Sequence, residues 1–266
     1  MADQVPVLSI VFMAVTAVFA FAIPVFLLIW YKKKKHASVV PFFIGCAVML
    51  VFALTLESLV HTVVFLTPGG RKIQSNIWLY ALYGGLMAGL FEESGRWIAF
   101  RTVLKRWSGN DANALMYGAG HGGFEAAALV GTSMISNLVV SVMINTGTMN
   151  LITDQLEGDV LAQINAAVRT LVTASPYLFL ASLAERVSAI ILHIALSVLV
   201  WFSVKKKKFS LLLTAFLIHF AVDFVTAALA GLGTHTAITE VAIAVMSLAA
   251  AFLSKRVWDK EKTVLE

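Results

Sequence analysis

Seven long apolar runs constrain the fold of this chain more than any other feature. They cover residues 6–30, 38–66, 77–104, 113–145, 177–204, 209–231 and 236–254. A helix that crosses a bilayer needs about 20 apolar residues, and each run is of that order. Because lipid offers no hydrogen-bond partners, only helices or closed barrels can span it. Runs of this length predict an all-α, polytopic membrane bundle.

The composition favours a single membrane-embedded domain over residues 1–266. Hydrophobic residues make up 59% of the chain and charged residues 13%, whereas soluble domains carry about 25% charged residues. The net charge of +5 does not indicate nucleic-acid binding, because the basic residues cluster at the ends of apolar runs. We expect a multi-pass protein of the cell membrane. The single cysteine, Cys46, excludes an internal disulfide and a multi-cysteine metal site.

Four basic clusters predict the side of the membrane that each end occupies. They are Lys32–Lys35; Arg101, Lys105 and Arg106; Lys205–Lys208; and Lys255, Arg256, Lys260 and Lys262. Cytoplasmic loops carry an excess of Lys and Arg, and these clusters hold 15 of the 20 basic residues. With seven spans, an outside N-terminus and a cytoplasmic C-terminus, all four lie in the cytoplasm. Eight spans would divide them between the two sides, so we favour seven.

The segment after the fourth run carries the main alternative. The run at 113–145 is too long for one simple span, so it either extends beyond the bilayer or breaks near Gly131 into an additional short helix. Residues 146–176 contain three acidic side chains and an amphipathic stretch at about 159–175. We expect this loop outside the cytoplasm, with the amphipathic stretch on the membrane surface.

Ionisable residues interrupt four consecutive runs, all within a core at residues 77–231. They are Glu92, Glu93 and Arg96; His121 and Glu125; His193; and His219 and Asp223. One charged side chain at the bilayer centre costs roughly 2.5–3.5 kcal/mol, so each is a candidate functional residue. At about 1.5 Å of rise per residue, all four sets lie roughly 12–21 Å from the cytoplasmic boundary. A shared depth predicts one polar site between four helices.

The spacing within each set agrees with one site. Glu92 and Arg96, His121 and Glu125, and His219 and Asp223 are each four residues apart and share a helix face. Small residues, which let helices approach closely in lipid, surround the first two sets: Gly84, Gly85, Ala88, Gly89, Gly118, Gly120, Gly122 and Gly123.

A second polar layer lies nearer the outer face by the same residue count. It consists of Glu57 and His61 on one run and Glu185 and Arg186 on another. We expect a structural role for this layer, with Arg186 paired to Glu57 or Glu185.

These residue types suit hydrolysis inside a membrane. A carboxylate and a histidine at one depth can jointly activate a water molecule. Further histidines can stabilise an oxyanion or ligate a metal. The signatures of other intramembrane proteases, His-Glu-x-x-His, Gly-x-Ser-Gly and Gly-x-Gly-Asp, do not occur in the sequence.

The motifs resemble those of the superfamily that contains the CAAX endopeptidases, the bacteriocin-processing enzymes and PrsW. Glu92-Glu93-Ser94-Gly95-Arg96 resembles its Glu-Glu-x-x-Arg motif, and Tyr117-x-x-x-His121 its aromatic-x-x-x-His motif. His193 and His219-x-x-x-Asp223 resemble the third and fourth motifs. The stretch around His121 is most similar to the YhfC branch, which is described as intramembrane metalloproteases.

The resemblance implies a role for each matching residue. Glu92 activates the water, with Glu93 as the alternative base, and His121 shares that water. Arg96 orients the glutamates, while His219 and the residue at 223 stabilise the oxyanion. The CAAX endopeptidases have Asn where this chain has Asp223. An ionised Asp cannot donate to an oxyanion, so it would have to be protonated or instead orient His219.

The sequence leaves the cofactor and two other functions open. His121, His193 and His219 with a carboxylate also suit a catalytic zinc, so the cofactor is either none or Zn. In the version without a metal, Glu125 and His193 support the site. The expected substrate is a membrane protein or a lipidated peptide. The alternatives are a proton-coupled or small-solute transporter, against which the lack of internal repeats counts, and an inactive scaffold, against which the glutamate pair counts.

Overall fold

The computed structural model describes residues 4–262, and within them every regular element is a helix. The α-helices are α1 (Val7–Lys35), α2 (Val40–Val48), α3 (Ser58–Phe65), α4 (Pro68–Gln74), α5 (Ile77–Arg101), α6 (Ala112–Glu125), α7 (Thr132–Asn145), α8 (Asn150–Thr153), α9 (Gly158–Thr173), α10 (Tyr177–Lys205), α11 (Phe209–Gly231) and α12 (Thr236–Glu261). Two π-helical segments, η1 (Met49–Glu57) and η3 (Ala126–Gly131), and a 3-10 turn, η2 (Lys105–Trp107), complete them. The prediction of an all-α bundle is confirmed.

Each of the seven predicted runs forms a helix, and six of the helices are long and apolar enough to cross a membrane. These six are Val7–Lys35, Val40–Phe65, Ala112–Asn145, Tyr177–Lys205, Phe209–Gly231 and Thr236–Glu261. The remaining helix, α5, has 25 residues, but it carries the glutamate pair and Arg96 and is not among the six. The count of seven membrane spans, which includes α5, therefore stays a prediction.

The over-long fourth run is one continuous helix. α6, η3 and α7 follow each other without a break from Ala112 to Asn145. The break that we considered near Gly131 is absent, and the π-helical segment η3 ends there instead. π-helical turns occur often near functional sites, and this one begins directly after Glu125.

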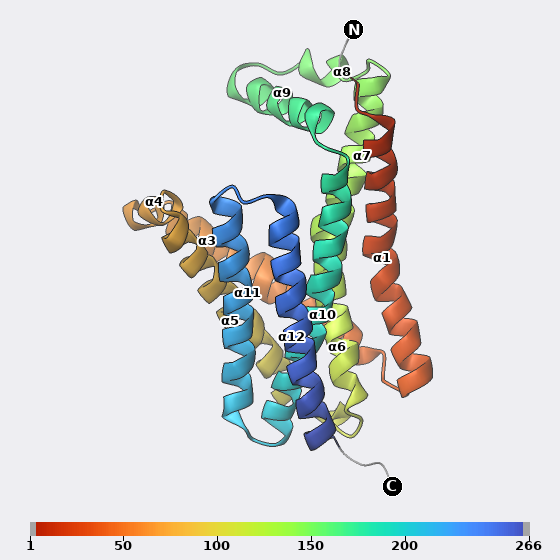
Figure 1. Ribbon diagram of the computed structural model, residues 1–266, viewed down its shortest axis with the longest axis vertical. Coiled ribbons are helices and arrows are strands. Elements are labelled where there is room, and N and C mark those ends of the chain that lie inside the picture. Colours follow the sequence, from red (N-terminus) through yellow and green to blue (C-terminus); the bar gives the residue numbers. More distant parts are fainter. Residues whose placement is uncertain (1–3, 263–266) are drawn as a thin grey trace.

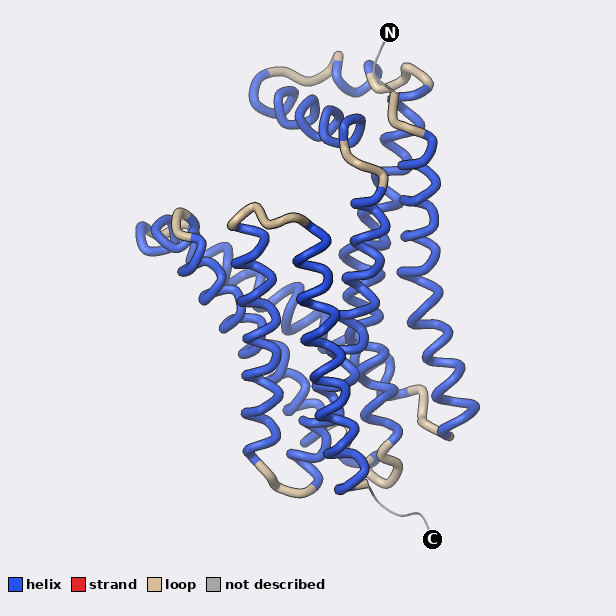
Figure 2. Tube along the Cα trace, in the orientation of Figure 1, coloured by secondary structure: helices blue, strands red, loops and turns tan. Residues whose placement is uncertain are grey.

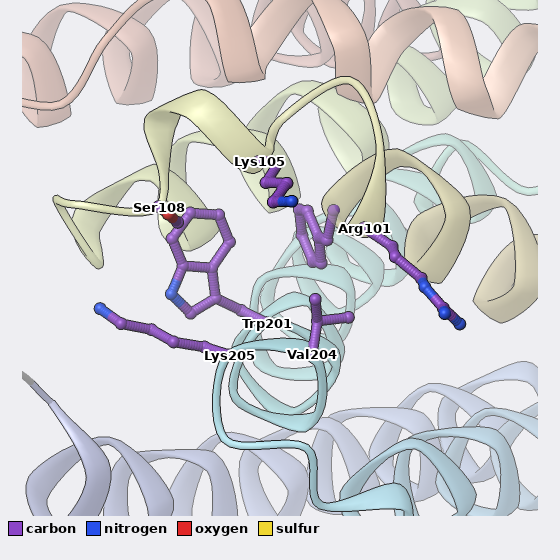
Figure 3. Close-up of a pocket in the computed structure, with 7 residues that line it drawn as sticks. Arg101, Lys105, Ser108, Trp201, Val204 and Lys205 are labelled. Atoms are coloured by element: carbon purple, nitrogen blue, oxygen red, sulfur yellow. The ribbon is translucent and has the colours of Figure 1, made fainter.

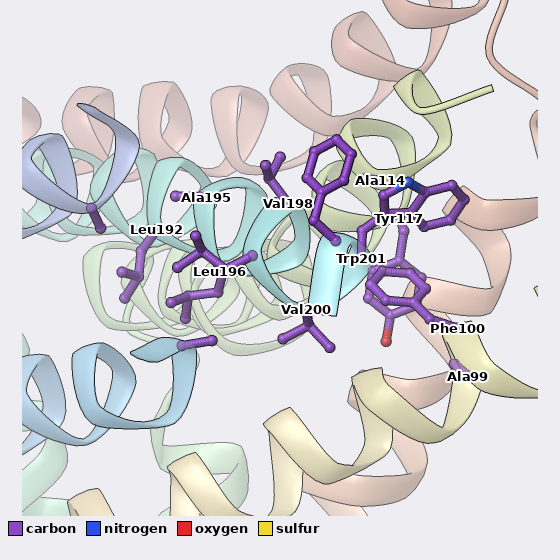
Figure 4. Packing of buried hydrophobic residues seen from close by; sticks show 14 of the residues in the cluster. Ala99, Phe100, Ala114, Tyr117, Leu192, Ala195, Leu196, Val198, Val200 and Trp201 are labelled. Carbon is purple, nitrogen blue, oxygen red and sulfur yellow. The ribbon is translucent and has the colours of Figure 1, made fainter. Parts of the chain in front are cut away.

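The lower part of the molecule in Figure 1 is a bundle built around α10, the most buried of the candidate spans. The most extensive packing joins α10 to α12 and α5 to α11, and α6 packs against α2 and α10. Figure 4 shows the apolar core of this bundle, where Leu196, Val200 and Trp201 follow one another along α10 and Trp201 lies beside Phe100 and Tyr117. Large exposed apolar side chains, such as Phe26, Leu59 and Phe252, cover the outside of the molecule, as a lipid-facing surface requires.

α1, α7 and the start of α10 extend above this bundle, and α9 lies across their upper end (Figure 1). A second apolar cluster, which includes Met13, Met134, Leu171 and Phe179, holds this upper part together. The predicted amphipathic stretch is helix α9, and its place on the membrane surface stays a prediction. Figure 2 shows loops at the upper and lower ends of the helices. The four basic clusters lie in or next to the last turns of helices at the lower end.

Candidate functional site

Four helices bring the predicted site residues together in the lower bundle. Glu92, Glu93 and Arg96 lie on α5, His121 and Glu125 on α6, His193 on α10, and His219 and Asp223 on α11. All except Glu125 and Asp223 are buried. This arrangement agrees with the prediction that four consecutive apolar runs contribute residues to one site.

Glycines let these helices approach each other. A Cβ on Gly85 of α5 would lie 2.7 Å from the Phe220 carbonyl oxygen of α11. A Cβ on Gly118 of α6 would lie 2.5 Å from Ile194 Cα of α10, and one on Gly122 would lie 3.0 Å from His193 Cβ. Because real Cβ atoms do not approach backbone so closely, larger residues would separate the helix pairs that carry the site.

The Glu92 carboxylate lies at the centre of three imidazoles. Its Oε2 is 2.8 Å from His121 Nε2 and 3.8 Å from His193 Nδ1, and its Oε1 is 3.9 Å from His219 Nε2. The first distance is a hydrogen bond, while the other two leave room for a bridging atom between carboxylate and imidazole. Glu92 is therefore the carboxylate that every histidine of the site faces.

Glu93 holds Arg96 and His219 in place. Its Oε1 accepts from Arg96 Nη1, and it lies 2.8 Å from His219 Nδ1. When Nδ1–H donates to Glu93, the Nε2 lone pair of His219 points toward Glu92. Because Glu93 and Arg96 are almost completely buried, and Glu93 is engaged by two partners, it is less available than Glu92 to act on a water molecule.

His193 is held from both sides. Its Nδ1 accepts from Arg96 Nη2 at 3.1 Å, and its Nε2 lies 2.7 Å from Glu125 Oε2. Glu125 Oε1 in turn accepts from Arg186 Nη1 at 2.6 Å. A carboxylate on one imidazole nitrogen fixes the tautomer and directs the other nitrogen, so Glu125 and Arg186 direct Nδ1 of His193 toward Glu92.

The predicted pairing of Arg186 with Glu57 or Glu185 is confirmed for Glu185. Arg186 contacts Glu185, as expected, but its other partner is Glu125 rather than Glu57. Arg186 is connected to the Glu92 site through Glu125 and His193 and is not part of a separate layer. The spacing of the residues gave no signal for this contact, because it joins two helices 61 residues apart in sequence.

Asp223 lies at the edge of the site. Its Oδ2 is 3.5 Å from His219 Nε2, and its side chain is 36% exposed. Because Glu93 already occupies Nδ1 of His219, Asp223 does not orient that imidazole through Nδ1. Asp223 faces the same nitrogen of His219, Nε2, as Glu92 does. Its partly exposed carboxylate is accessible to a molecule that enters the site.

A cavity of about 90 Å³ opens beside Glu92. Its polar lining consists of Glu92, Glu125, Glu185, Arg186, His193, His219, Asp223 and Thr226. Four of these side chains are carboxylates and one is a guanidinium. Such an excess of negative charge favours a bound cation or a polarised water molecule over an anion.

The donor atoms of Glu92, His193 and His219 fit a metal ion, since they all lie within 4.8 Å of one another. Two imidazoles and a carboxylate form one of the ligand sets of catalytic zinc. His121 was expected in the set, but it is not part of this group, because its Nε2 is turned to Glu92. Arg96 donates to Nδ1 of His193, so ligation at that atom would displace this hydrogen bond.

Glu57, His61 and Tyr83 form a second polar cluster, which the sequence predicted only in part. His61 Nε2 lies 3.1 Å from Glu57 Oε1, and its Nδ1 lies 2.9 Å from the hydroxyl of Tyr83. His61 and Tyr83 line a hollow of about 250 Å³ that reaches Asp223. Tyr83 carries no charge at neutral pH, so the pattern of charged residues in the sequence does not reveal it.

Comparisons with known proteins agree with this chemistry. A family model described as YhfC intramembrane metalloprotease matches residues 19–245, which include every residue of the site. The chain is also similar to the uncharacterized membrane protein YhfC of Bacillus subtilis strain 168, with 37% identity over 246 residues, or 90% of this chain and 92% of the relative. No solved structure matches the chain.

Proposed function

The chain belongs to the YhfC intramembrane metalloprotease family, and from this premise we propose that it is a peptidase that hydrolyses a peptide bond inside the membrane. The observation that carries the proposal is the position of Glu92. Its carboxylate is buried among helices, bonded to His121, faced by His193 and His219, and in contact with a polar cavity. A site that only fixes helix packing needs neither the cavity nor three imidazoles around one carboxylate.

In the proposed reaction, Glu92 is the general base. A water molecule in the cavity gives one proton to Glu92 while its oxygen bonds to the carbonyl carbon of the substrate. His121 holds the Glu92 carboxylate in position through the bond at 2.8 Å. The proton then passes from Glu92 to the leaving amine nitrogen as the carbon–nitrogen bond breaks.

His219 is the residue that we assign to the carbonyl oxygen. Its Nε2 faces Glu92 and Asp223 at the open edge of the site. When this nitrogen is protonated, it can donate to the oxyanion, and the Glu93 carboxylate at Nδ1 stabilises the resulting positive charge. Arg96 keeps Glu93 in place for this role.

A bound zinc ion fits the same residues. Glu92, His193 and His219 would hold it, with Glu93 and Glu125 on the outer nitrogens of the two imidazoles. When bound, zinc supplies a Lewis acid that lowers the pKa of a coordinated water molecule. With zinc bound, Glu92 would be a ligand, and the partly exposed Asp223 would be the carboxylate available to accept a proton.

The proposed substrate is a segment of a membrane protein or of a lipidated peptide that reaches the site from within the bilayer. All the site residues lie on helices of the bundle, and Glu92 and the three histidines are buried. A soluble, folded substrate could not bring its backbone to this depth.

The test uses the purified full-length protein in bilayer discs. Bound zinc per chain is measured, and cleavage of a panel of membrane-anchored peptides is followed for the wild type, Glu92→Gln, Glu93→Gln and His121→Ala. We expect cleavage by the wild type and none by Glu92→Gln. Zinc at one per chain that is lost in His219→Ala but kept in His121→Ala would select the metal version with the ligands named above.

Two outcomes would overturn the proposal. Absence of cleavage together with proton-dependent solute uptake into liposomes would assign the buried ionisable residues to transport. Cleavage that persists unchanged in Glu92→Gln and Glu93→Gln would place the chemistry elsewhere.

A further inference from the structure

Two adjoining hollows of about 320 Å³ each lie at the lower end of the bundle, away from the Glu92 cavity. They lie between the end of α5, the turn that follows it and the end of α10, and both are lined by Arg101 and Val204. Figure 3 shows the first hollow, with Trp201 and Val204 near its centre and Lys105, Lys205 and Arg101 around them. Each hollow has the volume of about ten water molecules, which is ample for a phosphate diester and its glycerol.

The hollows carry positive charge that the protein does not neutralise. Lys205 is paired with Asp111 at 2.5 Å. In the described part of the chain, by contrast, no carboxylate lies within ion-pair distance of Arg101, Lys105 or Lys207, all of which line the hollows. Three exposed cations around a concave surface favour a ligand with negative charge.

The walls between these cations are aromatic. Phe100 and Trp201 line one hollow, Trp97 and Phe209 line the other, and the Arg101 guanidinium lies 4.8 Å from the Trp97 ring centre. Tryptophan concentrates at the membrane–water boundary, and five of the six tryptophans lie near the basic end: Trp30, Trp97, Trp107, Trp201 and Trp258. The ligand therefore meets charge and apolar surface together, at the depth of lipid headgroups.

We propose that these hollows are a binding site for the headgroup of an anionic phospholipid. The phosphate binds Arg101, Lys105 and Lys207, and the adjoining glycerol and first methylenes lie against Trp97, Phe100 and Trp201. Basic pockets between helices on the cytoplasmic side are suited to such headgroups. The proposal does not depend on peptidase activity, because it concerns a different surface.

The site has a physical link to Glu92. Phe100 packs edge-on against Trp201 at 5.2 Å and against Tyr117 at 4.6 Å, measured between ring centres. Tyr117 in turn stacks on His121 at 5.8 Å, and His121 bonds Glu92. A headgroup against Phe100 is thus separated from the Glu92–His121 pair by two aromatic side chains, Phe100 and Tyr117.

The test is native mass spectrometry of the full-length protein, titrated with phosphatidylglycerol and, separately, with zwitterionic phosphatidylcholine. We expect phosphatidylglycerol to bind ~10-fold or more tightly than phosphatidylcholine, since each basic residue near the surface contributes to anionic-lipid binding. The triple variant Arg101→Gln/Lys105→Gln/Lys207→Gln should lose this preference. The matched control Lys32→Gln/Lys33→Gln/Lys34→Gln removes the same charge at the same end of the bundle and should keep it.

A second variant tests the hollow itself. Ser108 lines the first hollow and is exposed, so Ser108→Phe fills space without a change of charge and should weaken phosphatidylglycerol binding several-fold. If the triple variant does not fold, Ser108→Phe and the single change Lys105→Gln in the exposed turn provide the measurement. Equal loss in the two triple variants, or unchanged binding in Ser108→Phe, would overturn the proposal. Displacement of the lipid by equimolar glycerol phosphate would overturn it in favour of a soluble phosphate ester.

Discussion

Two glutamate–histidine clusters in this protein differ in how they are built. Glu57 and His61 are four residues apart on one helical stretch, and the His61 side chain is 29% exposed. Glu92 and His121 are 29 residues apart on two helices, and the His121 side chain is completely buried. The first pair forms wherever its helix forms. The second pair exists only when α5 and α6 have come together, and the whole Glu92 cluster exists only when α10 and α11 have packed beside them.

The largest expected difference between the clusters is in activity. Glu92→Gln keeps the size of the side chain but removes the base, and we expect a loss of peptide cleavage of about 10³-fold or more. Glu57→Gln makes the same change in the other cluster and should alter cleavage less than about threefold. Rates on one membrane-anchored peptide, with melting temperatures as a check of folding, decide the comparison. Equal losses would mean that both clusters belong to one site.

The next effect is on stability. Arg96→Gln leaves the buried Glu93 carboxylate with His219 alone, and removal of one partner of a buried ion pair costs about 3–5 kcal/mol. The double variant Arg96→Gln/Glu93→Gln should recover part of this loss, because no unpaired charge remains. Denaturant unfolding in detergent measures both variants. A double variant that is less stable than Arg96→Gln would show that Glu93 is stabilised without Arg96.

Arg186→Gln tests whether Arg186 belongs to the Glu92 cluster. Removal of a group that orients a ligand through a carboxylate typically lowers metal affinity or activity 10–100-fold, and we expect a loss in that range for zinc affinity or cleavage. Glu185→Gln is the control, since Glu185 contacts Arg186 but, among the described residues, forms no hydrogen bond with His193 or Glu125. Lower expression with full specific activity in Arg186→Gln would return Arg186 to a separate structural layer.

The smallest effect compares two adjacent glycines. Gly85→Ala places a Cβ 2.7 Å from the Phe220 carbonyl oxygen, whereas Gly84→Ala meets nothing within 4 Å. We expect Gly85→Ala to destabilise the protein by about 1–3 kcal/mol and Gly84→Ala to leave it unchanged or stabilise it by up to about 1 kcal/mol, since Ala favours helix. Melting temperatures in one detergent test both, and equal shifts would exclude close packing at Gly85 as the cause.

The sequence predicts the helices and the members of the Glu92 cluster well, because both follow from one-dimensional patterns. Apolar runs set the helix bounds to within a few residues, apart from the longer ends of α1 and α12, and counting residues from the basic ends places Glu92, His121, His193 and His219 at one depth. Neither inference needs any knowledge of side-chain direction.

The partners within the cluster could not be predicted in the same way. The contact of Arg186 with Glu125, and the turn of His121 Nε2 toward Glu92, depend on how α6 rotates against α5 and α10. That rotation is set by glycines such as Gly118 and Gly122, whose effect is visible only with the neighbouring helix in place. The absence of His121 from the group of ligand atoms follows from the same rotation.

The distribution of the cluster over four helices has a consequence for the synthesis of the chain. His219 follows its partner Glu93 by 126 residues, which at 5–20 residues per second corresponds to on the order of 10 s of translation. During that interval Glu93 on α5 lacks the imidazole of His219, because α11 has not yet been made. α5 is also the long helix that is not among the six candidate spans. We expect α5, the third of the seven predicted spans, to settle in the lipid only after α11, the sixth, has been made.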